Sequence, residues 1–215
     1  MEEVKDLIHR ASGELLVSYE QKNGVSIPKR LTQYEQENKR TVRWRRVLRW
    51  SASATLLVAF PVMGMLFISI PSPHFGILVG ISLFSVLVFG VLNIRAGEIC
   101  YKAFNASLDS LNVLEIFAYN ARRLDPFRTT GAITAESVRT ALLLLAREVA
   151  STKDTLRQLI RTYGENAPTN SIVSLGQKEL DAKARFEDTL SAAEEFGLAF
   201  KTEELFRASE KLVKS

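Results

Sequence analysis

Cysteine and histidine are scarce in this sequence, and their scarcity excludes several kinds of chemistry. The chain of 215 residues has one cysteine, Cys100, and two histidines. It can therefore form no intramolecular disulfide, and it offers no Cys-x-x-Cys or His-x-x-x-His pair to a metal ion. A glycine-rich phosphate-binding loop and the G-x-S-x-G motif are also missing. We expect no catalytic residues, no cofactor and no metal, and we expect that the chain is not an enzyme.

Charge is missing from one long segment. The whole chain has 28 Lys+Arg, 24 Asp+Glu and a formal net charge of +4, yet no Asp, Glu, Lys or Arg lies between Arg49 and Arg95. Ion pumps and proton-coupled transporters need an ionisable group inside the membrane. The uncharged segment therefore disfavours both of these classes.

What the segment contains instead is apolar sequence for two membrane spans. A transmembrane helix needs roughly 20 apolar residues, and the block is about twice that length, with Pro71 and Pro73 near its middle. Proline fixes φ and removes a backbone donor, which suits a tight turn. The alternative, a buried core hairpin, would need more apolar surface than the rest of the chain supplies. We predict a transmembrane hairpin with spans at about residues 50–70 and 75–94.

A basic and aromatic collar precedes the first span. Arginines next to a span mark its cytoplasmic side, and tryptophans favour the headgroup level. Arg95 and Lys102 follow the second span, so both termini are predicted to be cytoplasmic. Anionic lipid headgroups would occupy these arginines, so direct nucleic-acid binding is the weaker interpretation. The predicted membrane-interface anchors are Arg43, Trp44, Arg45, Arg46, Arg49 and Trp50.

Small and mildly polar residues mark the second span. Gly76, Gly80 and Gly90 are candidate helix-packing positions, because glycine lets another backbone come close. Their partner is either the first span or a neighbouring copy of the chain. Two spans cannot enclose a pathway alone, so any pore would require several copies. Candidate pore-lining groups are Ser82, Ser85 and Asn93.

The rest of the chain is predicted to be helical. Residues 2–22 show helical spacing, and a second helix begins near Lys29. The helix after the second span should stop before Asp125-Pro126, and Thr134 should cap a helix that reaches Tyr163. A final helical region begins near Ser171, with an interruption at Gly197. We thus predict an all-α membrane protein whose hairpin carries an extended cytoplasmic helical bundle or coiled coil. The predicted segments are 1–49, 50–94, 95–163 and 164–215.

The segment after the hairpin resembles a known family. LEIFAYNARRLDPF, residues 114–127, is similar to the post-hairpin pattern of the SLATT family of bacterial two-transmembrane proteins, which are associated with nucleotide-signalling systems. The helix AESVRTALLLLAREV fits the same layout, and the resemblance covers roughly residues 35–160. The resemblance implies a terminal effector of antiphage defence that breaches the membrane, sometimes under a nucleotide-binding or retron-type partner. It implies no catalytic residues.

These observations lead to one main hypothesis and two alternatives. The main hypothesis is an effector in the bacterial inner membrane that forms homo-oligomers and permeabilises or depolarises the membrane when activated. It would contact membrane lipids and a regulatory protein or nucleoprotein. Residues 165–215 would recognise that regulatory partner. One alternative is a membrane-tethered helical scaffold that recruits a soluble partner. The other is a channel subunit that conducts without a trigger.

Overall fold

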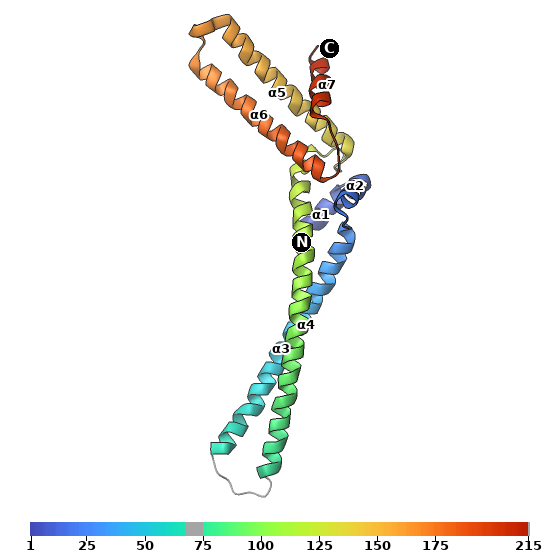
Figure 1. Cartoon of the computed structure of the whole chain (residues 1–215), viewed down its shortest axis with the longest axis vertical. Helices are drawn as coiled ribbons and strands as arrows, with labels where there is room; N and C mark the ends of the chain where they lie inside the picture. The colour runs from blue at the N-terminus through green and yellow to red at the C-terminus, as the bar shows by residue number, and fades with distance from the viewer. Residues whose placement is uncertain (68–74, 215) are drawn as a thin grey trace. The chain divides into compact units, whose positions relative to one another are not determined.

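The computed structural model is helical (Figure 1). It describes the backbone of residues 1–67 and 75–214, and their side chains except those of 61–63, 65–67, 75, 78, 165 and 212–214. These residues contain no strand, only two isolated β-bridges, so the all-α class is confirmed for them. The elements are α1 (Glu2–Arg10), α2 (Gly13–Asn23), α3 (Ile27–Phe67), α4 (Phe75–Leu124), the 3-10 turn η1 (Asp125–Phe127), α5 (Ala135–Tyr163), the 3-10 turn η2 (Gly164–Asn166), α6 (Thr169–Glu195) and α7 (Thr202–Lys214).

Most predicted helix ends are confirmed, because local signals set them. Helix α4 ends at Leu124, directly before Asp125-Pro126. Thr134 caps α5: its hydroxyl accepts from the Ser137 amide at 3.0 Å, and the Ser137 hydroxyl accepts from the Thr134 amide at 3.0 Å. Gly164 and Gly197 follow α5 and α6 with φ of 54° and 76°, values that glycine adopts without strain.

The N-terminal region differs from its prediction. Residues 2–22 form two helices instead of one, and the break falls at Ala11 and Ser12. There the backbone pairs with a distant residue: Ile133 donates to the Arg10 carbonyl at 2.7 Å, and Ser12 donates to the Ile133 carbonyl at 3.0 Å. The Ser12 side chain then caps α2. A tertiary contact therefore overrides the helical periodicity of this stretch.

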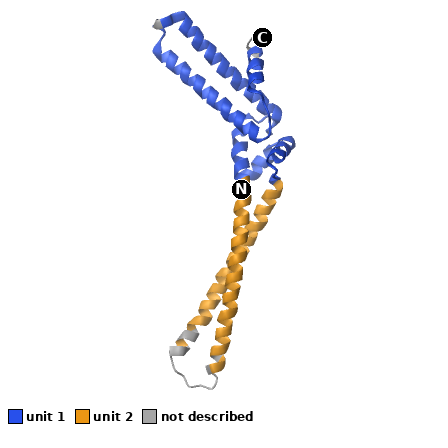
Figure 2. Ribbon diagram, in the orientation of Figure 1, with its two compact units in different colours: residues 1–27, 114–215 blue, residues 28–113 orange. Residues whose placement is uncertain are grey.

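The chain divides into two compact units (Figure 2). Unit 1 comprises residues 1–27 and 114–215, and unit 2 comprises residues 28–113. Helices α3 and α4 each contribute residues to both units. The segments predicted from the sequence follow position relative to the membrane, whereas these units follow packing. Packing groups the two ends of the chain together, which no local pattern indicates.

An aromatic cluster holds three separate parts of unit 1 together. Tyr19 of α2, Phe117 of α4 and Phe196 at the end of α6 are buried, with ring centroids 5.1 to 5.5 Å apart. Such tilted and edge-to-face pairs add to the stabilisation that burial provides. The turn after Phe196 also lies close to α2, because a Cβ at Gly197 would lie 3.1 Å from the Ser18 carbonyl oxygen. The cluster is therefore the point at which α2, α4 and α6 meet.

Polar contacts reinforce this meeting point. Lys22 donates to the Glu194 carbonyl at 2.6 Å, and Asn23 donates to the Glu195 carbonyl at 3.3 Å. These side chains satisfy carbonyl groups that the last turn of α6 leaves without intrahelical donors. The terminal carbonyls of α6 thus receive donors from α2.

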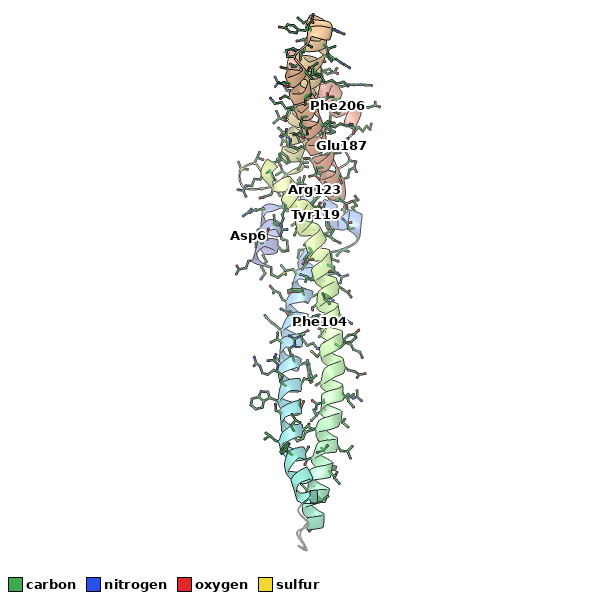
Figure 3. All side chains as sticks on the ribbon, turned by 90° about the vertical axis from the view of Figure 1, so that its left-hand side faces the viewer. Asp6, Phe104, Tyr119, Arg123, Glu187 and Phe206 are labelled. Atoms are coloured by element: carbon green, nitrogen blue, oxygen red, sulfur yellow. The ribbon has the colours of Figure 1, made fainter. Side chains whose placement is uncertain are left out.

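Arg123 joins α4 to α6 in a second polar contact. Its guanidinium lies 2.5 Å from both the backbone oxygen and the carboxylate of Asp188, and 5.5 Å from the centre of the Tyr119 ring. Figure 3 labels Tyr119 and Arg123 on α4. This contact and the aromatic cluster together fix the C-terminal end of α4 against α6.

Tyr19 should titrate unusually. Burial raises the pKa of its phenol above 10.0, and the nearby Glu195 carboxylate raises it further. Because the folded state favours the neutral phenol, the free energy of unfolding should fall as the pH rises above 10.0. In a tyrosinate absorbance titration of the full chain, Tyr19→Phe should remove one of five ionisations, and the lost ionisation should lie above pH 10.0. Loss of an ionisation at or below that pH would contradict this assignment.

Candidate membrane-associated site

Helices α3 and α4 pack along a regular seam in unit 2. On α4 the inward positions alternate at steps of three and four residues, and on α3 Thr41, Leu48 and Thr55 recur every seven. This is the spacing of a coiled-coil seam. Small side chains dominate it, and small side chains let two helix axes come close. The buried or bonded seam residues of α4 are Asn93, Ala96, Cys100, Ala103, Ser107 and Ser110.

The contacts across the seam show that the two helices run antiparallel. Cys100 contacts the Thr41 carbonyl with its sulfur at 3.9 Å, whereas Asn93 bonds to Ser51, ten residues further along α3. Residue numbers on α4 therefore fall as those on α3 rise. A Cβ at Gly97 would lie 3.7 Å from the Leu48 side chain, which fits the same order.

A polar cluster lies at one point of this seam. The Ser51 hydroxyl donates to the side-chain oxygen of Asn93, and the Asn93 amide donates to the Thr55 hydroxyl at 3.5 Å. The Thr55 hydroxyl in turn donates to the Ser51 carbonyl at 2.8 Å. Interhelical hydrogen bonds of this kind fix register where the surroundings are apolar. Asn93, a predicted pore-lining residue, thus binds within its own chain.

The apolar surface of unit 2 is exposed. Among the described residues, one helical stretch, Val79–Phe127, which comprises α4 from Val79 onward and η1, is long and apolar enough to cross a membrane, which suggests membrane association. Only 6% of its most apolar 18-residue window is buried. Large exposed apolar patches mark interaction sites for lipid or protein. The patch includes Leu57, Phe60, Ile77, Phe84, Leu87 and Ile94.

The predicted collar lies on α3, and its arginines point away from α4. Thr41, Leu48 and Ser51 form the seam, and at about 100° per residue the four arginines fall on the outer arc of the helix. No carboxylate within the described chain pairs with them. Trp44 is half-buried and Trp50 is 73% exposed. The exposed arginines are Arg43, Arg45, Arg46 and Arg49.

The candidate packing glycines face open space. A Cβ at Gly76, Gly80 or Gly90 would meet no atom within 4 Å. Ser82 is half-buried, and the Ser85 hydroxyl donates to the Ile81 carbonyl at 2.8 Å. The predicted turn at Pro71 and Pro73 lies in 68–74, outside the described residues. Close packing at the glycines and pore lining at the serines stay predictions.

Two sets of residues make tertiary contacts that the sequence analysis did not identify. Ser51 and Thr55 bind Asn93, and the signal that could have found them is their heptad register, because Ser51 follows Leu48 by three residues and Thr55 follows it by seven. The aromatic cluster of Tyr19, Phe117 and Phe196 gives no local signal, because its members are far apart in the sequence.

Neither the described side chains nor the comparisons assign a chemical activity. Across residues 1–67 and 75–214, no group of three or more His, Cys, Asp and Glu side chains could hold a metal ion. Comparisons of the chain with protein-family models, with curated proteins and with solved structures found no match.

Proposed function

We propose that this chain is a bacterial inner-membrane effector whose copies assemble and permeabilise the membrane when activated. In this proposal residues 50–94 form a two-span hairpin, and both termini are cytoplasmic. The chain contacts lipids and a regulatory protein or nucleoprotein partner, binds no cofactor and catalyses no reaction. The similarity of residues 114–127 to the SLATT pattern supports this class of function.

The exposure of apolar residues on α4 carries the proposal. A core helix of a soluble protein would be mostly buried, whereas the apolar window of α4 is 6% buried. Leaving large side chains such as Ile94, which is 70% exposed, in water costs about 1.5–3 kcal/mol each relative to burial. A bilayer removes this cost, because its hydrocarbon core covers apolar side chains from every direction.

Charge distribution supports the hairpin topology. The collar arginines precede the first apolar segment, and Arg95 and Lys102 follow the second. Positively charged residues next to spans stay in the cytoplasm. Because α3 and α4 run antiparallel, both charged ends lie at the same end of unit 2. A single membrane surface can therefore hold both sets of cations.

A single chain cannot form a pore, so the proposed function requires assembly. Two helices packed on each other leave no path between them, so permeabilisation needs several copies. Gly80 supports assembly, because its surface is open in the single chain and would admit another helix.

Membrane potential in bacteria tests the proposal. Expression of the full chain, raised in steps to drive assembly by mass action, should depolarise cells as measured with a potential-sensitive dye. Gly80→Leu should weaken depolarisation several-fold, because leucine blocks close helix approach yet meets nothing in its own chain. Gly64→Leu on α3 is the matched control, because Gly64 is equally open. An intact potential at every level, with the chain inserted, would contradict the permeabilising function.

One feature of unit 1 favours a membrane-tethered scaffold as the second candidate. The α5–α6 pair exposes Ile160, Tyr163, Val173 and Leu180, which could recruit a soluble partner. A scaffold needs the hairpin only as an anchor. Replacing residues 50–94 with an unrelated two-span hairpin should then preserve partner recruitment, whereas the effector should lose its ability to depolarise cells.

A further inference from the structure

Helix α4 carries a second regular stripe beside the seam that contacts α3. We call it the outer stripe: Gly80, Leu87, Ile94, Tyr101, Phe104 and Leu108. From Gly80 to Tyr101 its members are seven residues apart, and Phe104 and Leu108 follow after steps of three and four. Each member comes directly after a position in the heptad register of the buried seam. Gly76 and Gly90 fit the same register. Sustained heptad spacing is typical of a helix that packs on another helix.

The outer stripe is unpartnered in the single chain. Ile94 is 70% exposed, Tyr101 67%, Phe104 44% and Leu108 37%. Figure 3 labels Phe104 on α4, in unit 2. The residues just before them in sequence, including Ala103 and Ser107, are buried. One face of α4 is thus satisfied, and the adjacent face presents large apolar side chains to its surroundings.

Lipid cannot cover the whole stripe. With the bilayer core ending near Ile94, a rise of about 1.5 Å per residue puts Tyr101 about 10 Å beyond it and Leu108 about 21 Å beyond it. The headgroup region adds only about 5–8 Å on each side of the core. Phe104 and Leu108 therefore lie in water, and burying them requires protein.

The length and course of the stripe restrict which protein can cover it. A partner that follows it must continue unbroken from the hydrocarbon into water, as α4 does over 50 residues. A second copy in the same membrane has this helix in the same orientation, with glycines and aromatic residues at the same heights. Arg95, Glu98 and Lys102 beside the stripe are exposed and have no ion pair within the described chain. Both signs of charge therefore lie beside the stripe.

We propose that the outer stripe is a homo-oligomeric interface in which the α4 helices of two copies pack in parallel and in register. This inference rests on the proposed membrane insertion, because the bilayer sets the parallel orientation. The glycines bring the helices together inside the membrane, and Tyr101, Phe104 and Leu108 extend the contact into the cytoplasm. The same residue of each copy then faces its counterpart.

Cysteine cross-linking in isolated membranes tests this interface. In a Cys100→Ala background, Tyr101→Cys, Phe104→Cys and Leu108→Cys place thiols on the stripe. Lys102→Cys, Asn105→Cys and Asp109→Cys are matched controls, each one position further along. A disulfide needs Cβ atoms within roughly 4 Å, so mild oxidation should give several-fold more covalent dimer at the stripe positions. Co-expression of two differently tagged copies identifies the product as a homodimer.

The interface would be overturned by equal cross-linking at all positions, by preference for the controls, or by no dimer even with a longer bifunctional thiol reagent. A product that contains another protein would also overturn it. These results are separate from the proposed function, which depolarisation measures in the same cells. Depolarisation without stripe-specific dimers would reject only the interface. Recovery of the chain in the soluble fraction would reject membrane insertion itself.

Discussion

Phe196→Ala should lower the free energy of unfolding of the full chain by about 3–5 kcal/mol, the usual cost of removing a buried aromatic ring. Phe196 is fully buried, and its ring lies 5.1 Å from that of Tyr19 and 5.5 Å from that of Phe117. Alanine would leave a cavity where α2, α4 and α6 meet. Thermal unfolding in mild detergent, followed by circular dichroism, measures the change.

Ile116→Ala is the matched control for this prediction. Ile116 neighbours Phe117 on α4 but is 57% exposed, so its truncation should cost well under 1 kcal/mol in a stability measurement. A similar loss in both variants would mean that the aromatic cluster does not stabilise unit 1. Unchanged stability of Phe196→Ala would lead to the same conclusion.

Reversing the charge of the four collar arginines should change the topology of the inserted chain. Each basic residue near an anionic membrane surface contributes about 1 kcal/mol, and four arginines of α3 contribute together. Their replacement by glutamate removes this attraction and adds repulsion. We expect the chain to lose its cytoplasmic bias, so that protease added outside spheroplasts cleaves an epitope at the C-terminus. The variant is Arg43→Glu with Arg45→Glu, Arg46→Glu and Arg49→Glu.

Replacing the same four arginines with lysine separates charge from side-chain shape. Topology follows the number of positive charges, and the four arginines have no ion pair to lose within the described residues. The lysine variant should keep its C-terminal epitope protected. If the lysine and glutamate variants behave alike, the arginines do not act through their charge.

Local signals made the helix boundaries predictable. Asp125-Pro126 stops α4, Thr134 begins α5, and Gly164 and Gly197 end the helices before them. Each signal works within one or two turns, so it needs no knowledge of the rest of the fold. The break at Ser12 shows the limit of such signals, because the Ile133 backbone that stabilises it is more than a hundred residues away.

The grouping into units could not be predicted in the same way. The sequence indicated a C-terminal helical region at residues 164–215, and it gave no sign that Phe196 from this region contacts Tyr19 and Phe117. Removing the region would therefore expose the core of unit 1. Neither local sequence identifies the distant partner of a contact such as this one, and only the folded chain reveals the pairing.

The candidate site was predictable in part. The length and lack of charge of the apolar segment indicated helices suited to a membrane, and α4 meets that description. The glycines drew attention to one face of α4, whereas α3 packs on another face through Ala96, Ala103 and Asn93. Alanine and serine are too common in helices for the sequence to distinguish the two faces.

Labelling of single cysteines in spheroplasts tests the proposed hairpin most directly. In a Cys100→Ala background, a membrane-impermeant maleimide should label His74→Cys in intact spheroplasts. It should label Glu2→Cys and Lys211→Cys only after lysis. This pattern would establish two spans with both termini in the cytoplasm. Labelling of either terminal cysteine in intact spheroplasts, or of all three only after lysis, would contradict the proposed topology.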